Sequence, residues 1–141
     1  NAYQAIERIV NFFPEDQQGQ VRLNLSMNLK AIVSQRLLLS LAGGLVPANE
    51  VMLNEALIRE IIVKGQYEKI TDVMEQNGSI GMCTFDQALL DLYKKGLISE
   101  ETVVSQSDKA SDIKVKLQSI KLGEGSGGLS NMDTSRLSMS D

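Results

Sequence analysis

Apolar residues recur every three or four positions over the first part of the chain, a pattern typical of amphipathic helices. The spacing predicts a helix over residues 2–13, which Pro14 ends because proline disfavours helical geometry in the preceding residue. It predicts a second helix from Glu15 to Gln35, with Pro14 at its first position and acidic residues at its positive end. The apolar face of this second helix includes Leu25, Leu29, Ile32 and Val33.

Two short apolar runs lie on either side of Gly43-Gly44. The run before the glycines is rich in leucine and contains Leu37, Leu38, Leu39 and Leu41. The run after them is bounded by turn residues, and its apolar members are Val46, Val51 and Leu53. Two adjacent glycines supply the positive φ angles that a tight hairpin turn needs. The pattern therefore predicts a helix that leads into a β-hairpin.

Helical spacing returns after the hairpin. Asn54 is a suitable cap for a helix that Gly65 would end, and its apolar positions are Leu57, Ile58, Ile61 and Ile62. A fourth helix carries Tyr67, Ile70, Val73 and Met74, and it is expected to close at Asn77-Gly78 with left-handed geometry.

Two more helix starts are marked by capping residues. Thr84 and Gln87 have the spacing of a capping box at the start of a strongly amphipathic helix, which Gly96 is placed to end. Ser99 begins another short helix with acidic residues in its first turn.

The last segments lose this periodicity. Apolar and polar residues alternate over residues 112–118, which predicts a short strand or an extended segment laid on a surface. Beyond Leu122 the sequence is rich in Gly and Ser and is expected to be disordered. The fold class predicted from these patterns is mainly α with one β-hairpin, that is, α+β.

Composition narrows the function classes. The 141 residues, 43% of them apolar, suffice for one modest core, and 14 basic against 18 acidic residues argue against a nucleic-acid surface. The absence of histidine excludes Ser-His-Asp and Cys-His arrangements and every His-based metal site. The sequence contains no GxxxxGK[ST] phosphate loop, and its single cysteine, Cys83, is interpreted as a small buried filler.

Four blocks in a fixed order carry a resemblance to a known family. They are NFFPED (residues 11–16), LSMNLKAIVSQRL (25–37), GSIGMCTFDQAL (78–89) and KKGLISEE (94–101). Together they resemble the carboxy-terminal part of the type IV pilus retraction ATPases, the PilT/PilU family. The NFFPE form, with Arg36 after Gln35, is more similar to the PilU branch, and the resemblance covers about residues 2–122.

The resemblance implies the end of a RecA-like P-loop ATPase core over residues 1–53 and a helical carboxy-terminal region over 54–122. Residues 123–141 form the predicted disordered tail. The intact protein is then expected to be a homohexamer that hydrolyses ATP with Mg²⁺ at the cytoplasmic face of the inner membrane. Its expected partners are the inner-membrane pilus platform protein and, as a further candidate, a paralogous retraction ATPase, but no nucleic acid.

Two groups of residues are the candidate functional sites that the resemblance implies. Gln35 and Arg36 belong to a Gln-Arg-Leu element shared by secretion ATPases. There Arg36 either contacts nucleotide or a neighbouring subunit, or simply caps the end of the second helix. The family's retraction motif, Ala-Ile-Arg-Asn-Leu, has as its counterpart Leu57, Ile58, Arg59, Glu60 and Ile61. A plain amphipathic core helix with a solvated Arg59–Glu60 pair is the other interpretation of this segment.

Two functions of different classes remain open from the sequence. The first is the carboxy-terminal part of a hexameric motor that powers pilus retraction and twitching motility. In that case this chain, without the phosphate loop and the acidic metal ligand, is expected to be inactive alone and to bind neither nucleotide nor metal. The second is a non-catalytic helical adaptor that binds the motor or the platform protein.

Overall fold

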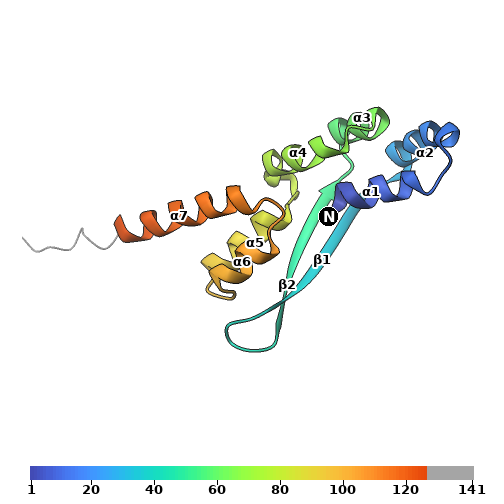
Figure 1. The fold of residues 1–141 in the computed structure, drawn as a ribbon. Helices are drawn as coiled ribbons and strands as arrows, with labels where there is room; N and C mark the ends of the chain where they lie inside the picture. The colour runs from blue at the N-terminus through green and yellow to red at the C-terminus, as the bar shows by residue number, and fades with distance from the viewer. Residues whose placement is uncertain (127–141) are drawn as a thin grey trace, which may run out of the picture.

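The computed structural model describes residues 1–126. Two helices precede a β-hairpin, and a series of helices follows it (Figure 1). In chain order the elements are α1 (Ala2–Asn11), α2 (Glu15–Asn28), β1 (Ala31–Leu39), β2 (Leu45–Leu53), α3 (Ala56–Lys64), η1 (Tyr67–Lys69), α4 (Ile70–Gln76), η2 (Gly78–Ile80), α5 (Phe85–Lys94), α6 (Glu100–Gln106) and α7 (Ala110–Ser126).

The hairpin prediction is confirmed, but the strands are joined by a loop over residues 40–44 rather than by a tight turn of two glycines. Strands β1 and β2 pair antiparallel from Ala31 with Leu53 to Leu39 with Leu45. Gly43 and Gly44 have φ angles of 89° and 79°, the left-handed values that the turn requires. The two strands form a long ribbon (Figure 1), and in the loop that joins them Leu41 donates its amide to the carbonyl of Leu97, between α5 and α6, at 2.9 Å.

The second helix is shorter than the sequence predicted. It ends at Asn28 rather than Gln35, and Leu29 already has extended geometry with ψ 138°. The prediction was wrong because the buried Asn54 donates from Nδ2 to the carbonyls of Ser26 and Leu29, at 2.9 and 2.8 Å. The backbone after Leu29 can therefore join the ribbon. Pro14, moreover, is the residue before the helix rather than its first residue.

The ribbon has one row of side chains packed against helices and one row that faces outward. Strand alternation places successive residues on opposite faces. The inward row contributes to two separate hydrophobic cores and carries polar residues between them. From one end to the other it reads Ile32, Ser34, Arg36 and Leu38 on β1, and Met52, Glu50, Ala48 and Val46 on β2.

The first core lies between α1, α2, α3, α4 and one end of the ribbon. Its buried members include Ile6 and Val10 from α1, Met52 from β2, Ile58 and Ile62 from α3, and Ile70 and Met74 from α4. The second core lies between α5, α6, α7 and the other end of the ribbon. Its buried members include Leu38, Ala48, Phe85, Leu89, Ile98, Val103, Ile113 and Leu117.

The helix ends predicted after the hairpin are confirmed only in part. Gly65 ends α3 with φ 68° as predicted, but Glu55, and not Asn54, is the residue that precedes the helix. The capping role predicted for Asn54 is wrong because its side chain donates to two carbonyls at the end of α2 instead. Asn77 has φ −113°, so the left-handed close predicted at Asn77-Gly78 does not occur, whereas Gly81 adopts φ 98°.

The capping box of α5 is confirmed. The Thr84 hydroxyl accepts from the Gln87 amide, and the Gln87 side chain accepts from the Thr84 amide. Gly96 follows the helix with φ 68°. The helix that starts after Ser99 is also present as α6, with the Ser99 hydroxyl accepting from Thr102.

The strand predicted over residues 112–118 is wrong, because this segment belongs to α7. Ile113 and Leu117 are spaced one helical turn apart and are fully buried in the second core, while Val115 between them is exposed. Residues four positions apart share a face in both a strand and a helix, so the spacing of Ile113 and Leu117 fits either structure. Packing against α6 favours the helix. The helix continues through Ser126, and the rest of the predicted tail, 127–141, lies outside the described residues.

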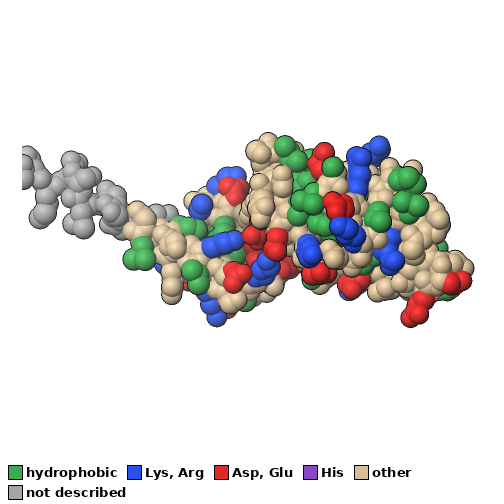
Figure 2. All heavy atoms as spheres, turned by 90° about the horizontal axis from the view of Figure 1, so that it is seen from above, with side chains coloured by type: hydrophobic (Ala, Val, Ile, Leu, Met, Phe, Trp, Pro, Cys, Tyr) green, Lys and Arg blue, Asp and Glu red, His purple; other side chains and the backbone are tan. Residues whose placement is uncertain are grey.

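Within residues 1–126, no helix combines the length and the hydropathy needed to cross a bilayer. Basic and acidic side chains alternate over the face in Figure 2, without a continuous basic patch on that face.

Candidate functional site

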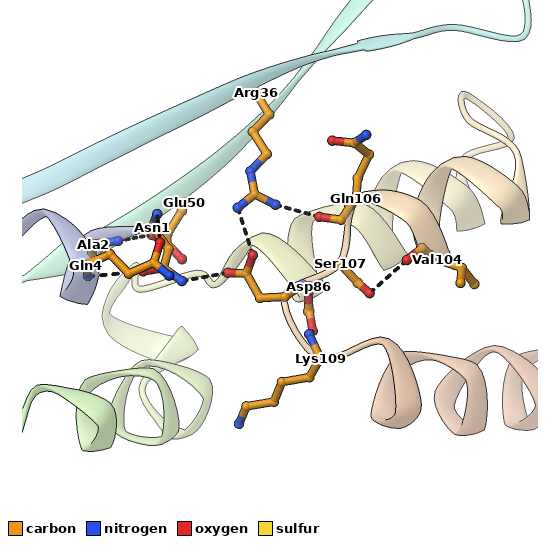
Figure 3. Close-up of polar contacts among 11 residues, drawn as sticks. Asn1, Ala2, Gln4, Arg36, Glu50, Asp86, Val104, Gln106, Ser107 and Lys109 are labelled. Atoms are coloured by element: carbon orange, nitrogen blue, oxygen red, sulfur yellow. Dashed lines mark hydrogen bonds and ion pairs between the residues drawn. The ribbon is translucent and has the colours of Figure 1, made fainter.

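Arg36 occupies the middle of β1, on the inward row where the two cores meet. Its Nη2 atom lies 2.8 Å from Asp108 Oδ1, and Nη1 donates to the carbonyl of Gln106. The guanidinium also stacks over the Phe85 ring, 3.9 Å from the centroid. Because Arg36 is in a strand, the interpretation as a helix cap is wrong, and its donors are directed at the end of α6 and at the linker that follows it (Figure 3).

Asp108 receives two side-chain hydrogen bonds, from Arg36 and from Asn1 Nδ2 at 2.9 Å. Burial acts to raise the pKa of Asp108, but these two donors and the charge of Arg36 outweigh it and hold the pKa below its usual value. The carboxylate is therefore ionised at neutral pH, and it binds two separate elements, β1 and the start of α1.

Asp86, buried in the first turn of α5, holds the same linker through its backbone. Its two carboxylate oxygens accept from the amides of Asp108 and Lys109, at 2.8 and 3.2 Å. These amides lie just before α7, so the negative charge faces the positive end of that helix.

Glu50 is a buried carboxylate on β2 within the same inward row. Its Oε1 atom accepts from the amide of Ala2, the first residue of α1, at 2.6 Å. Burial raises the pKa of Glu50, partly offset by this hydrogen bond. We name Asn1, Arg36, Glu50, Asp86 and Asp108 the polar junction (Figure 3).

Gln35 points away from the polar junction. It lies on the outward row of β1, where Nε2 donates to Asn49 Oδ1 on β2 at 2.9 Å. Gln35 and Arg36, adjacent in the sequence, therefore face opposite sides of the ribbon, and the structure does not bring them into one site.

The counterpart of the retraction motif, residues 57–61, lies in α3. Ile58 and Ile61 are buried in the first core, whereas Leu57 is 52% exposed. Arg59 Nε donates to the backbone carbonyl of Asn54 at 2.9 Å, and Glu60 pairs with Lys64. The amphipathic pattern is present, but the charged residues pair with Asn54 and Lys64 rather than with each other.

Helices α3 and α4 enclose a shallow groove of about 480 Å³. Its lining combines apolar side chains, among them Leu57, Ile61 and Val73, with charged ones such as Glu60, Lys64 and Asp72. Within the motif counterpart, Leu57 and Glu60 are therefore exposed in this groove, whereas the neighbouring Ile58 is buried in the first core.

Sequence reasoning missed Glu50, Asp86 and Asp108. One signal was available for Glu50, because alternation along β2 places it on the same row as Met52 and Ala48, where a charge is unusual. Asp86 and Asp108 carry no local signal, since their roles depend on contacts between distant segments. Among the described residues, no group of Cys, Asp and Glu side chains is arranged to hold a metal ion.

Comparison with known proteins agrees with the fold. The chain is 44% identical to the type IV pilus ATPase PilU of Pseudomonas aeruginosa over 124 residues, which is 87% of this chain and 32% of that protein. It is 37% identical over 101 residues to the retraction ATPase PilT of the same organism, 72% of this chain and 29% of that protein. No family model matches the chain.

A crystal structure of the pilus retraction motor PilT with bound ADP superposes with a TM-score of 0.69 at 36% identity, over 78% of this chain and 30% of PilT. The fold is thus that of a carboxy-terminal portion of a pilus ATPase. The chain belongs to the PilT/PilU family of type IV pilus ATPases. It spans about a third of the length of the relatives it matches.

Proposed function

We propose that this chain is the carboxy-terminal part of a hexameric ATPase that powers type IV pilus retraction and twitching motility. The proposal is supported by the similarity to PilU and PilT and, above all, by one structural observation: the outward row of the ribbon carries exposed large apolar side chains on both sides of the Gln35–Asn49 pair. Its exposed large side chains are Val33, Leu37, Leu39 and Leu45.

Such a surface is unusual for an independent protein. Contiguous exposed apolar side chains mark places where another surface packs. A two-stranded ribbon also leaves backbone donors and acceptors unpaired along both edges, and it is marginal unless a larger sheet or a helix layer supports it. The proposal assigns the covering layer to the remainder of a RecA-like core in the same polypeptide.

The chemistry of ATP hydrolysis then belongs to residues outside this chain. Phosphoryl transfer needs a phosphate cradle, an acidic Mg²⁺ ligand and a positioned water. The sequence has no phosphate-loop motif, so ATP and Mg²⁺ would be held elsewhere in the intact motor. This chain would supply the edge of the core and the helical layer that transmits movement.

The proposed setting follows the same family relationship. The motor would act as a homohexamer at the cytoplasmic face of the inner membrane, on the pilus platform protein, with a paralogous retraction ATPase as a further partner. The mildly acidic composition and the mixed charges in Figure 2 favour protein partners over nucleic acid.

The decisive experiment uses the complete gene product that contains this chain. Motor function predicts Mg²⁺-dependent ATP turnover and rings visible by electron microscopy. An adaptor of the motor or platform, the alternative, predicts no phosphate-loop sequence upstream and no ATP turnover.

A matched pair of substitutions tests the role of the ribbon's outward row in that complete protein. Leu39 and Leu122 are both 75% exposed in this structure, the first on β1 and the second on α7. Leu39→Ser should reduce ATP turnover and ring formation because the side chain would be covered in the intact motor, and Leu122→Ser should leave both unchanged. Equal behaviour of the two variants would remove the main support for the proposal.

A further inference from the structure

The backbone groups along the two outer edges of the ribbon can be assigned from the hydrogen bonds at its ends. In an antiparallel pair, successive residues direct their amide and carbonyl alternately to the partner strand and away from it. The carbonyl of Lys30 accepts from the amide of Asn54 at 2.9 Å at one end. At the other end the amide of Ser40 donates to the carbonyl of Gly44 at 3.0 Å. The even-numbered residues of β1 therefore face β2, and the odd-numbered ones direct their backbone groups to the outer edge.

The outer edge of β2 is largely occupied. Val51 exchanges two backbone hydrogen bonds with Cys83, of 2.8 and 2.9 Å, on the side away from β1. The carbonyl of Leu53 accepts from the amide of Glu55, and Pro47 has no amide hydrogen to offer to this edge. Helix α5, which starts just after Cys83, packs beside β2 (Figure 1). A further strand therefore has no continuous edge to pair with on this side.

The outer edge of β1 is open over the whole strand. Its outward-directed residues are all exposed and have no backbone partner among the described residues: Ala31, Val33, Gln35, Leu37 and Leu39. The edge contains no proline, and the register with β2 runs without a bulge. Natural proteins interrupt a free edge with such features, because an uninterrupted edge pairs with other chains. This edge is thus typical of an internal strand of a larger sheet.

The side chains of the same residues indicate what kind of segment fits there. Alternation places them together on the outward row of the ribbon. Val33, Leu37 and Leu39 are 68%, 59% and 75% exposed. A strand paired with β1 would bring its own side chains to within roughly 4.5–5.5 Å of these three, and apolar cross-strand pairs stabilise a sheet. The fitting segment is therefore an extended one with apolar residues at alternate positions.

We propose that β1 is an internal strand of the intact protein, paired along its outer edge with a strand from the part of the polypeptide outside this chain. Strand β2 then forms the end of the sheet. This inference rests on the proposed function, which places the remainder of a RecA-like core in the same polypeptide. A second copy of the chain is the competing occupant, but an edge left open until subunits meet would expose each free subunit to unspecific strand pairing.

Amide hydrogen exchange in the complete gene product tests the pairing without any substitution. The amides of Val33, Gln35 and Leu37 should exchange at least ~100-fold more slowly than that of Asn49, which lies opposite Gln35 and faces the outer edge of β2. Mass spectrometry with fragmentation that resolves single amides gives the readout. Fast exchange at the three β1 amides would overturn the inference. Protection that disappears when the protein is dissociated into folded single subunits would assign the edge to a second copy and would also overturn it.

A matched pair of proline substitutions tests the same asymmetry through stability. Gln35 and Asn49 are directly opposite and exposed, and either substitution removes the hydrogen bond between their side chains and one outward-directed amide. Gln35→Pro should lower the thermal unfolding midpoint by at least about 5 °C more than Asn49→Pro, because only the β1 amide has a strand partner. If only Asn49→Pro yields folded protein, the difference has the expected sign. Equal shifts in the two variants would contradict the added strand.

ATP turnover of the same preparation separates this inference from the proposed function. Slow exchange along β1 without Mg²⁺-dependent turnover would retain the added strand and refute the motor. Turnover combined with fast exchange along β1 would retain the motor and refute the added strand.

Discussion

Residues 57–61 on α3 combine a buried and an exposed position side by side, so the roles of core and surface can be separated by adjacent substitutions. Ile58 is fully buried and Leu57 is 52% exposed. Ile58→Ala and Leu57→Ala remove the same number of carbon atoms from one helix. We expect the first to destabilise the fold strongly and the second to leave it nearly intact.

The magnitudes follow from burial. Ile58→Ala deletes Cγ1, Cγ2 and Cδ1 from the first core, a loss of about 2.4 kcal/mol at ~0.8 kcal/mol per buried methylene-sized group. The cavity left behind raises the cost to about 3–4 kcal/mol, and the higher helix propensity of alanine returns about 0.5 kcal/mol. Leu57→Ala loses about half of the transfer term and leaves no closed cavity, so the expected cost is at most about 1 kcal/mol.

Equilibrium unfolding in urea, followed by the circular-dichroism signal of the helices, measures this difference in stability. A gap of about 2 kcal/mol corresponds to a shift of roughly 1 M in the unfolding midpoint for a chain of this size. If Leu57→Ala were as destabilising as Ile58→Ala, the assignment of one residue to the core and the other to the surface would be refuted. Under the proposed motor function, a loss of pilus retraction in the folded Leu57→Ala variant would then indicate a surface contact of this residue.

Three further outcomes are expected from local contacts. Asn54→Ala should cost about 2–3 kcal/mol in urea unfolding, because a buried carbonyl and a partly buried one at the end of α2 lose their donor. Thr84→Ala should cost about 1 kcal/mol and increase amide exchange in the first turn of α5, while Thr84→Ser should restore both values. Asp108 has a lowered pKa in the folded state, so its stabilisation is complete above the unfolded value of about 4 and is lost as the pH falls through the folded pKa. Asp108→Asn should therefore reduce the acid-side slope of stability against pH, and an unaltered slope would contradict the assigned ionisation.

The sequence predicted most of the fold where local and tertiary preferences agree. The Gly43-Gly44 turn and the Thr84 capping box are satisfied by neighbouring residues, and both are present. The end of α2 was missed because Asn54, distant in sequence, takes up its last carbonyls. The helical state of residues 112–118 was missed because alternate apolar residues also include a helical pair, Ile113 and Leu117.

The candidate site was less predictable than the fold. Arg36 was predicted as a candidate interface residue, but its contact with Asp108 depends on segments more than seventy positions apart. The residue pair Gln35 and Arg36 was predicted as one interface element, and strand alternation separates the two side chains. The interface role proposed for Gln35 stays a prediction, on the outward face of the ribbon.

Because β1 and β2 supply both cores from a single row, the ribbon imposes a shared constraint on the evolution of this chain. Insertion of one residue into β1 would turn over the side chains on one side of the insertion and withdraw Ile32 or Leu38 from its core, and an insertion into β2 would do the same to Met52 or Ala48. Length changes should therefore be tolerated in the Gly43-Gly44 turn and excluded from the strands on both sides of it.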